Sequence, residues 1–149
     1  MEENNIVKYW YENEVKEDGR TDYQTLEFRR SKMIISHYLN DIDMEIADVC
    51  GGTGAYSFWL AEMGYKVHML DLAQNHIDLM KRRSIDTNIP LSSCICADAR
   101  NLPYENESMD MVLLMGALYH LQLKESRIKC LAEAFRVLKM EVELSYVLF

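Results

Sequence analysis

The sequence predicts an α/β fold, and three observations lead to it. Short apolar segments alternate with amphipathic segments of helical period along most of the chain. The glycine-rich turn 51–54 separates the first apolar segment from the amphipathic segment that follows it. The run 109–115 is almost continuously apolar, which is typical of a buried central strand in a parallel sheet. Together these features predict a Rossmann-like parallel sheet with right-handed crossovers and helices on both faces.

Size and charge narrow the class of protein. The 149 residues suffice for a single domain, 1–149, with a core of its own. The formal net charge of −8 argues against binding to nucleic acid or to an anionic membrane, because both need clustered cations. No apolar run approaches the length of a membrane span, and the acidic start is unlike an export signal. Four cysteines without a C-x-x-C pair suggest a cytoplasmic protein with no metal site: Cys50, Cys94, Cys96 and Cys130.

The first 40 residues are expected to form a helical arm. Aromatic and acidic residues surround the segment Tyr9 to Tyr11, and Thr21-x-x-Gln24 resembles a capping box. A helix over 22–40 then follows, and its apolar stripe is expected to pack on the sheet. The residues of that stripe are Leu26, Arg30, Met33, Ile34, His37 and Tyr38, with His37 in the core or at its rim.

The sheet core is expected to span 45–149. Strands are expected at 45–50, 66–71, 91–97, 109–115 and 142–149. Helices are expected at 54–63, 74–84 and 124–139. The first of these helices should bury Phe58, Trp59 and Leu60, and the second should carry Ile77, Leu79 and Met80 as its apolar residues. The last helix should pack through Ile128, Leu131, Phe135 and Leu138, which follow at helical spacing.

Three features meet where the first three strands end. Open α/β sheets bind ligands beyond the carboxyl ends of their strands. The glycine turn follows the first strand, Asp71 ends the second, and Asp98 stands at the end of the third. Asp71 could accept hydrogen bonds from two ribose hydroxyls, and Asp98 could accept one from an adenine amino group. The sequence therefore predicts a site for an adenosine-containing cofactor.

The identity of that cofactor depends on the glycine spacing. A dinucleotide turn needs G-x-G-x-x-G, and Ser57 occupies the position of the third glycine. A phosphate-cradling P-loop is excluded because no G-x-x-x-x-G-K-[ST] sequence occurs. A nicotinamide dehydrogenase domain is disfavoured but stays open.

The segment 48–54, the acids Asp71 and Asp98 and the run 114–121 resemble the class I S-adenosylmethionine-dependent methyltransferases of the small-molecule type. The resemblance implies that the glycines approach the methionine part, Asp71 binds the ribose hydroxyls, and Asp98 with Ala99 holds the adenine. It also implies that Gly116 to Tyr119 faces the methyl group and that Tyr9 to Tyr11 help to cover the site. The expected cofactor-binding residues are Asp48, Cys50, Gly52, Gly54, Asp71, Leu72, Asp98, Ala99 and Gly116.

The chain departs from the family at two places. Cys50 occupies a position that is usually glycine, where a side chain adds bulk and restricts φ. The chain also ends at Phe149, so the sheet is expected to be incomplete, with about five of the family's seven strands. Its exposed apolar edge then predicts a homodimer.

The resemblance implies an enzyme that transfers a methyl group from S-adenosylmethionine to a small molecule. The alternative is a cofactor-binding remnant without chemistry, or a subunit that works only in an oligomer. Tyr119 and His120 are the nearest candidates for a general base, and both are weak ones.

Overall fold

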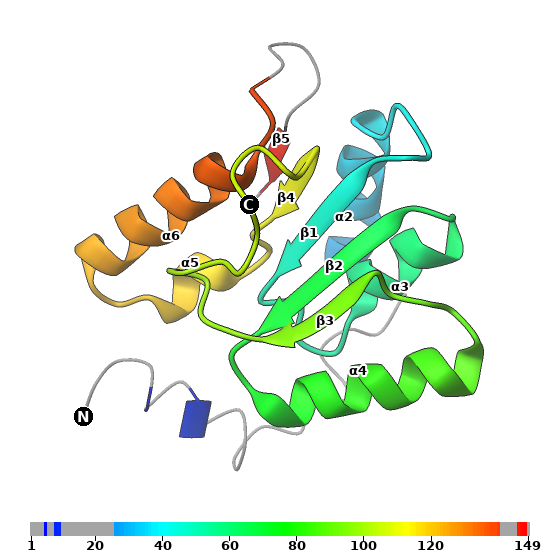
Figure 1. Ribbon diagram of the computed structural model, residues 1–149, viewed down its shortest axis with the longest axis horizontal. Helices are drawn as coiled ribbons and strands as arrows, with labels where there is room; N and C mark the ends of the chain where they lie inside the picture. Colours follow the sequence, from blue (N-terminus) through cyan, green and yellow to red (C-terminus); the bar gives the residue numbers. More distant parts are fainter. Residues whose placement is uncertain (1–4, 6–7, 10–25, 141–145, 149) are drawn as a thin grey trace.

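The computed structural model describes residues 5, 8–9, 26–140 and 146–148. Its centre is a five-stranded sheet in the order β3-β2-β1-β4-β5, and every neighbouring pair of strands is parallel (Figure 1). The predicted parallel α/β sheet is therefore confirmed. The strands are β1 (Glu45–Val49), β2 (Lys66–Asp71), β3 (Ser93–Cys96), β4 (Met111–Leu113) and β5 (Tyr146–Leu148).

Five named helices accompany the sheet in the described part of the chain. On one face, the core joins helices before and after β1 to the sheet, with Phe28, Trp59 and Ile46 in one buried cluster. On the other face, Ala47 packs with Cys130 and Ala134 of the last helix. The alternation of β1 side chains thus fills two separate cores, as a doubly covered sheet requires. The helices are α2 (Leu26–His37), α3 (Ala55–Glu62), α4 (Gln74–Thr87), α5 (Ala117–His120) and α6 (Lys124–Val137).

The strand predictions are confirmed in position, and three of the first four strands are shorter than predicted. β2 covers the predicted range 66–71, and β1 is one residue shorter than predicted. β4 has only three residues within the predicted 109–115, because Met109 forms an isolated bridge to Leu138 outside the strand. β3 is likewise shorter than 91–97. The start of the predicted last strand, 142–145, lies outside the described residues.

The predicted packing face is wrong within α2, although Tyr38 directly after the helix packs against the core as predicted. The structure buries Phe28 and Ile35, whereas Met33 is 75% exposed and Ile34 is 55% exposed. His37 is also exposed, so it is neither a core nor a rim residue. The residues 22–25 and the capping box before α2 lie outside the described residues.

The predicted face of α6 is right for two residues and wrong for two: Leu138 is buried and Leu131 packs partly buried against the core, as predicted. The buried residues are Ser126, Cys130, Ala134 and Val137, while Ile128 and Phe135 are exposed. Small side chains on this face let the helix lie close to the sheet. In α4, Ile77 and Met80 are buried as predicted, but Leu79 is 38% exposed. The buried residues Phe58, Trp59 and Leu60 confirm the prediction for α3.

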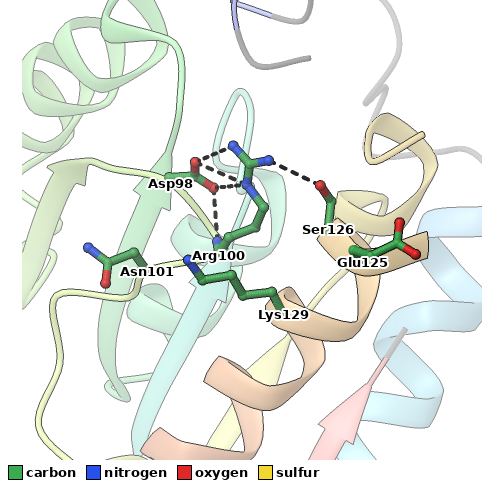
Figure 2. Close-up of a pocket in the computed structure, with 6 residues that line it drawn as sticks. All are labelled: Asp98, Arg100, Asn101, Glu125, Ser126 and Lys129. Carbon is green, nitrogen blue, oxygen red and sulfur yellow. Dashed lines mark hydrogen bonds and ion pairs between the residues drawn. The ribbon is translucent and has the colours of Figure 1, made fainter. Parts of the chain in front are cut away.

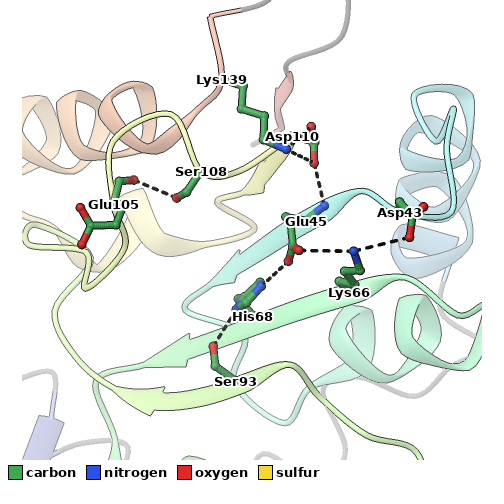
Figure 3. A network of polar contacts seen from close by, with 9 residues as sticks. All are labelled: Asp43, Glu45, Lys66, His68, Ser93, Glu105, Ser108, Asp110 and Lys139. Carbon is green, nitrogen blue, oxygen red and sulfur yellow. Dashed lines mark hydrogen bonds and ion pairs between the residues drawn. The ribbon is translucent and has the colours of Figure 1, made fainter.

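Polar side chains connect the strands at the end of the sheet opposite the predicted site (Figure 3). His68 on β2 lies 2.6 Å from a carboxylate oxygen of Glu45 and 2.9 Å from the hydroxyl of Ser93, and so links three strands. Asp110 accepts from the backbone N–H of Glu45 and from the ammonium of Lys139. These contacts hold the amino ends of the strands in register. No described helix is long and apolar enough to cross a membrane.

Candidate cofactor site

The turn after β1 has an unusual backbone. Cys50, Gly52 and Gly54 all have positive φ, with values of 62°, 54° and 74°. The turn is closed by a 2.8 Å hydrogen bond from the N–H of Gly54 to the carbonyl of Gly51, and Gly54 then caps α3. Glycine adopts this conformation without strain, whereas a residue with a Cβ does so at a cost of about 1–2 kcal/mol. Cys50 therefore carries the backbone strain expected from its sequence position.

Gly54 has a packing reason to be glycine as well. A Cβ built at Gly54 would lie 2.3 Å from the sulfur of Met80 in α4 and 3.1 Å from the ring of Phe58. Arg83, also in α4, stacks 4.2 Å from the centre of the Phe58 ring and donates to the carbonyl of Thr53 at 3.3 Å. The turn is thus held between α3 and α4.

Asp71 ends β2 and ties that strand to the turn. One carboxylate oxygen accepts from the N–H of Gly52 at 2.9 Å. The other accepts from the N–H of Ala73 at 2.9 Å and lies 3.2 Å from Nδ1 of His76. Asp71 and His76 are both buried. Asp71 therefore fixes the glycine turn and the start of α4 with one carboxylate.

Asp48 is fully buried directly before the turn. The hydroxyl of Ser57 donates to its Oδ2 at 2.6 Å, and its Oδ1 has no hydrogen-bond partner among the described residues. The pKa of Asp48 is raised from 3.8 to about 6: burial is the largest cause, the Ser57 hydrogen bond opposes it, and the nearby Asp71 charge adds to it. Asp48 lies beneath the site and does not face an open ligand position.

Asp98 and Arg100 form an ion pair beyond the end of β3 (Figure 2). The guanidinium of Arg100 donates to both carboxylate oxygens of Asp98, and its shortest contact is 2.8 Å from Nη2 to Oδ2. The backbone N–H of Arg100 also donates to Oδ1 of Asp98. On its other side, the guanidinium donates to the hydroxyl of Ser126 in α6 at 3.1 Å. The expected adenine acceptor is therefore already engaged by a side chain of its own loop.

This ion pair borders a pocket of about 240 Å³ between the loop after β3 and the first turns of α6. Charged side chains of both signs line it. Figure 2 shows the lining residues, which are Asp98, Arg100, Asn101, Glu125, Ser126 and Lys129.

The predicted methyl-facing segment follows β4. Gly116 has a φ of 96°, and a Cβ built there would meet no atom within 4 Å, so the space beside it is open. Tyr119 in α5 is 90% exposed, and His120 is partly exposed. Leu72 is partly buried and Ala99 is buried, each directly after its acid. Tyr9 is 59% exposed, and Trp10 and Tyr11 lie outside the described residues.

Sequence reasoning missed four residues that shape this site. From the sequence, Ser57 is interpreted only as the absence of the third glycine of a dinucleotide turn, yet its hydroxyl is the hydrogen-bond partner of Asp48. His76 and Arg83 showed no signal beyond their place in a helix, although i and i+5 spacing from Asp71 to His76 suits a strand-end acid and the first helical turn. The spacing Asp98-x-Arg100 was visible, and it could have suggested an ion pair.

The surroundings of Cys50 disfavour the ionisation of its thiol. Burial raises its pKa well above the usual 9.0, and the charges of Asp71, Asp48 and Asp98 raise it further. The carboxylates of Asp71, Asp48 and Asp98 are therefore all close enough to act on the thiol of Cys50.

Comparison of the sequence with known protein families identifies one matching family. A methyltransferase domain family matches residues 46–141, well over half of the chain. A demethylmenaquinone methyltransferase of Oceanobacillus iheyensis is 33% identical over 95 residues, which are 62% of this chain and 39% of that protein. A probable tRNA methyltransferase 9B of Homo sapiens is 28% identical over 95 residues, 62% of this chain and 18% of that protein. The chain thus spans less than two fifths of the length of these curated relatives.

Solved structures share the fold. The PH0226 protein of Pyrococcus horikoshii OT3 superposes with a TM-score of 0.67 at 22% identity, over 93% of this chain and 62% of that one. An S-adenosylmethionine-dependent methyltransferase of Methanosarcina mazei gives 0.66 at 28% identity, over 71% and 52% of the two chains. The [4+2]-cyclase SpnF gives 0.69 at 23% identity, over 83% and 45%. With its parallel sheet, its glycine turn and its acids at successive strand ends, the chain belongs to the class I S-adenosylmethionine-dependent methyltransferase domain family.

Proposed function

We propose that this chain binds S-adenosylmethionine at the turn after β1 and transfers its methyl group to a small molecule. The observation that carries the proposal is the hydrogen bond from the N–H of Gly52 to Asp71. It joins the acid that would bind the ribose to the turn that would approach the methionine part, and both lie at one edge of the sheet. Asp98 ends the neighbouring strand β3, which pairs with β2 in parallel register.

The residues present fit the cofactor. Glycine at 52 and 54 keeps the turn open to close approach by a ligand. The space beside Gly116 is free of protein atoms, where the resemblance places the reacting end of the cofactor. Asp71 would accept from ribose hydroxyls, and Asp98 with the backbone of Ala99 would hold the adenine. The bound sulfonium would supply an activated methyl group.

The chain's own contribution to methyl transfer would be positioning. In-line displacement at a methyl carbon needs alignment and exclusion of water, and oriented reactants can gain about 7–11 kcal/mol from proximity. The high exposure of Tyr119 gives no support to a role as a positioned base. We therefore assign no catalytic residue, and an acceptor that loses its proton readily suits this site.

A small acceptor is favoured over tRNA by charge. Two relatives are named for quite different acceptors, demethylmenaquinone and tRNA. A protein that grips a polynucleotide carries clustered Lys and Arg, whereas this chain has a net charge of −8. A small uncharged or cationic acceptor needs no such surface.

A second candidate is a cofactor-binding chain that needs a second copy. β5 has a neighbour on one side only in the described sheet order, and α6 exposes Ile128 and Phe135. An open edge and exposed apolar side chains suit a homodimer. The two candidates share the cofactor site and differ in whether a lone chain turns over.

Calorimetry with S-adenosylhomocysteine, S-adenosylmethionine and NAD tests the site. We expect the first two to bind and NAD to fail. Asp71→Ala should abolish binding, whereas Asp86→Ala, an exposed acid in α4, should leave it unchanged. Binding that survives in folded Asp71→Ala would refute the site. Formation of S-adenosylhomocysteine from S-adenosylmethionine over a panel of acceptors then separates an enzyme from a binding protein.

A further inference from the structure

We propose that Arg100 is a gate on the cofactor site, which occupies Asp98 in the free protein and must leave it when the adenine amino group binds. This inference rests on the proposed function. It goes further by naming a residue that sets cofactor affinity and by giving the direction of its effect.

The first step is the engagement of Asp98. Both of its oxygens accept from the Arg100 side chain, at 3.1 Å and 3.2 Å from Nε and at 2.8 Å from Nη2. A guanidinium presents planar N–H donors to a carboxylate much as an amino-substituted base does. The adenine amino group therefore meets a competitor on the acceptor that it would use.

The second step is the place to which Arg100 can move. The pocket of about 240 Å³ lies directly beside the guanidinium, so the side chain has room for another rotamer. Glu125 lines the same pocket from α6 and offers a second carboxylate. Ser126, the next residue in α6, already accepts a hydrogen bond from Nη1. In the proposed gate, Arg100 exchanges Asp98 for Glu125, whose carboxylate points away from the guanidinium in Figure 2 and would turn toward it, while Arg100 stays near Ser126.

The third step is the strength of the competition. The side chains of Arg100 and Asp98 are 22% and 28% exposed, so solvent and salt partly screen the pair. Such a pair is strong enough to lower affinity and weak enough to be broken by a ligand. The gate would therefore reduce cofactor binding without preventing it.

The test is calorimetric titration with S-adenosylhomocysteine, which carries no net charge, against the unmodified chain and Arg100→Gln. We expect Arg100→Gln to bind about 3- to 10-fold more tightly, the range expected when a partly exposed ion pair no longer competes. Lys129→Gln is the matched control. It removes one positive charge from the same pocket, makes no described contact with Asp98, and should change the affinity little.

Salt dependence provides a second measurement that needs no variant. Raising NaCl from about 0.05 to 0.5 M screens the ion pair, so affinity should rise in the unmodified chain and stay flat in Arg100→Gln. Glu125→Gln should weaken binding, because the released guanidinium then lacks its second carboxylate.

The outcomes separate the two proposals. Equal or weaker binding by folded Arg100→Gln, with normal binding by the unmodified chain, would overturn the gate and leave the cofactor site intact. The absence of S-adenosylhomocysteine binding in every protein, Arg100→Gln included, would refute the proposed function, and the gate would fall with it. Binding by Arg100→Gln alone would support both.

Discussion

Ser57 in α3 donates a 2.6 Å hydrogen bond to the buried carboxyl of Asp48, nine residues earlier in β1. The serine stands where a dinucleotide turn would carry its third glycine. That glycine serves close packing between helix and strand in dinucleotide-binding folds. Here a polar side chain occupies the same junction and satisfies one oxygen of an acid that has no access to water. The departure from the glycine pattern is therefore part of the structure around Asp48.

Asp48 should make stability depend on pH. Its pKa is raised in the folded protein, mainly by burial, from 3.8 to about 6. Its stabilising contribution is therefore fully present below about pH 4 and is lost as the pH rises through about 6. The shift of about 2 units corresponds to about 3 kcal/mol. Asp48→Asn should gain about 2 kcal/mol relative to the unmodified chain between pH 4.5 and pH 8, because about 1 kcal/mol of the difference has already developed at pH 4.5.

Urea unfolding at a series of pH values measures this difference. Asp86→Asn, in which an exposed carboxyl is lost, should track the unmodified chain at every pH. A constant difference between Asp48→Asn and the unmodified chain from pH 4.5 to 8 would contradict a raised pKa.

Gly54 and Gly116 should respond differently to alanine. Both have positive φ, so each substitution costs about 1–2 kcal/mol of backbone strain. At Gly54 the new methyl group also meets the sulfur of Met80, and overpacking adds about 1–3 kcal/mol. At Gly116 it meets open space. Gly54→Ala should therefore be the more destabilising of the two in chemical unfolding, and equal losses would show that Met80 moves aside freely.

The cysteines should differ in reactivity. Burial raises the pKa of Cys130 to about 11 and holds that of Cys50 well above 9.0, so few thiolates form there at pH 8. Cys96 is exposed. Iodoacetamide at pH 8, followed by mass spectrometry, should label Cys96 first and should label Cys130 only after unfolding. Cys96→Ser should remove the fast phase, and early labelling of Cys130 would contradict its burial.

The proposed homodimer can be tested by sedimentation velocity. The outer edge of β5 and the exposed Phe135 of α6 are the surfaces that we propose for it. We expect a monomer–dimer equilibrium that shifts toward the dimer between about 1 and 100 µM, since pairing of open sheet edges buries backbone donors and acceptors. A single monomeric species over that range would exclude the dimer.

The sequence predicts strands better than helix faces in this protein, for a physical reason. β2 was located to the residue because its apolar run ends at an acid and a helix start. For α6, periodicity selected the large apolar residues Ile128 and Phe135, which are exposed. The helix instead packs through Cys130 and Ala134, whose size allows close approach to the sheet. Hydrophobicity alone does not reveal which stripe of a helix has side chains small enough to let the helix approach the sheet closely.

The positions of Asp71 and Asp98 were predictable from the sequence, whereas the side chains that contact them were not. Strand-end positions brought Asp71 and Asp98 to one edge, because parallel strands end together. The engagement of Asp98 by Arg100 depends on loop conformation, and that of Asp71 by His76 depends on where α4 begins. Neither is encoded in a repeating pattern of the sequence.

The structural role of the Asp71 carboxylate affects which residues a chain keeps when it loses methyltransferase activity during evolution. It accepts hydrogen bonds from the Gly52 turn and from the start of α4 in the ligand-free structure, so we expect a mutation that removes it to lower stability as well as binding. Selection for a folded chain alone would keep this acid long after methyl transfer had ceased. An intact Asp71 is therefore evidence for the fold, and evidence for methyl transfer has to come from the part of the site that would hold the acceptor.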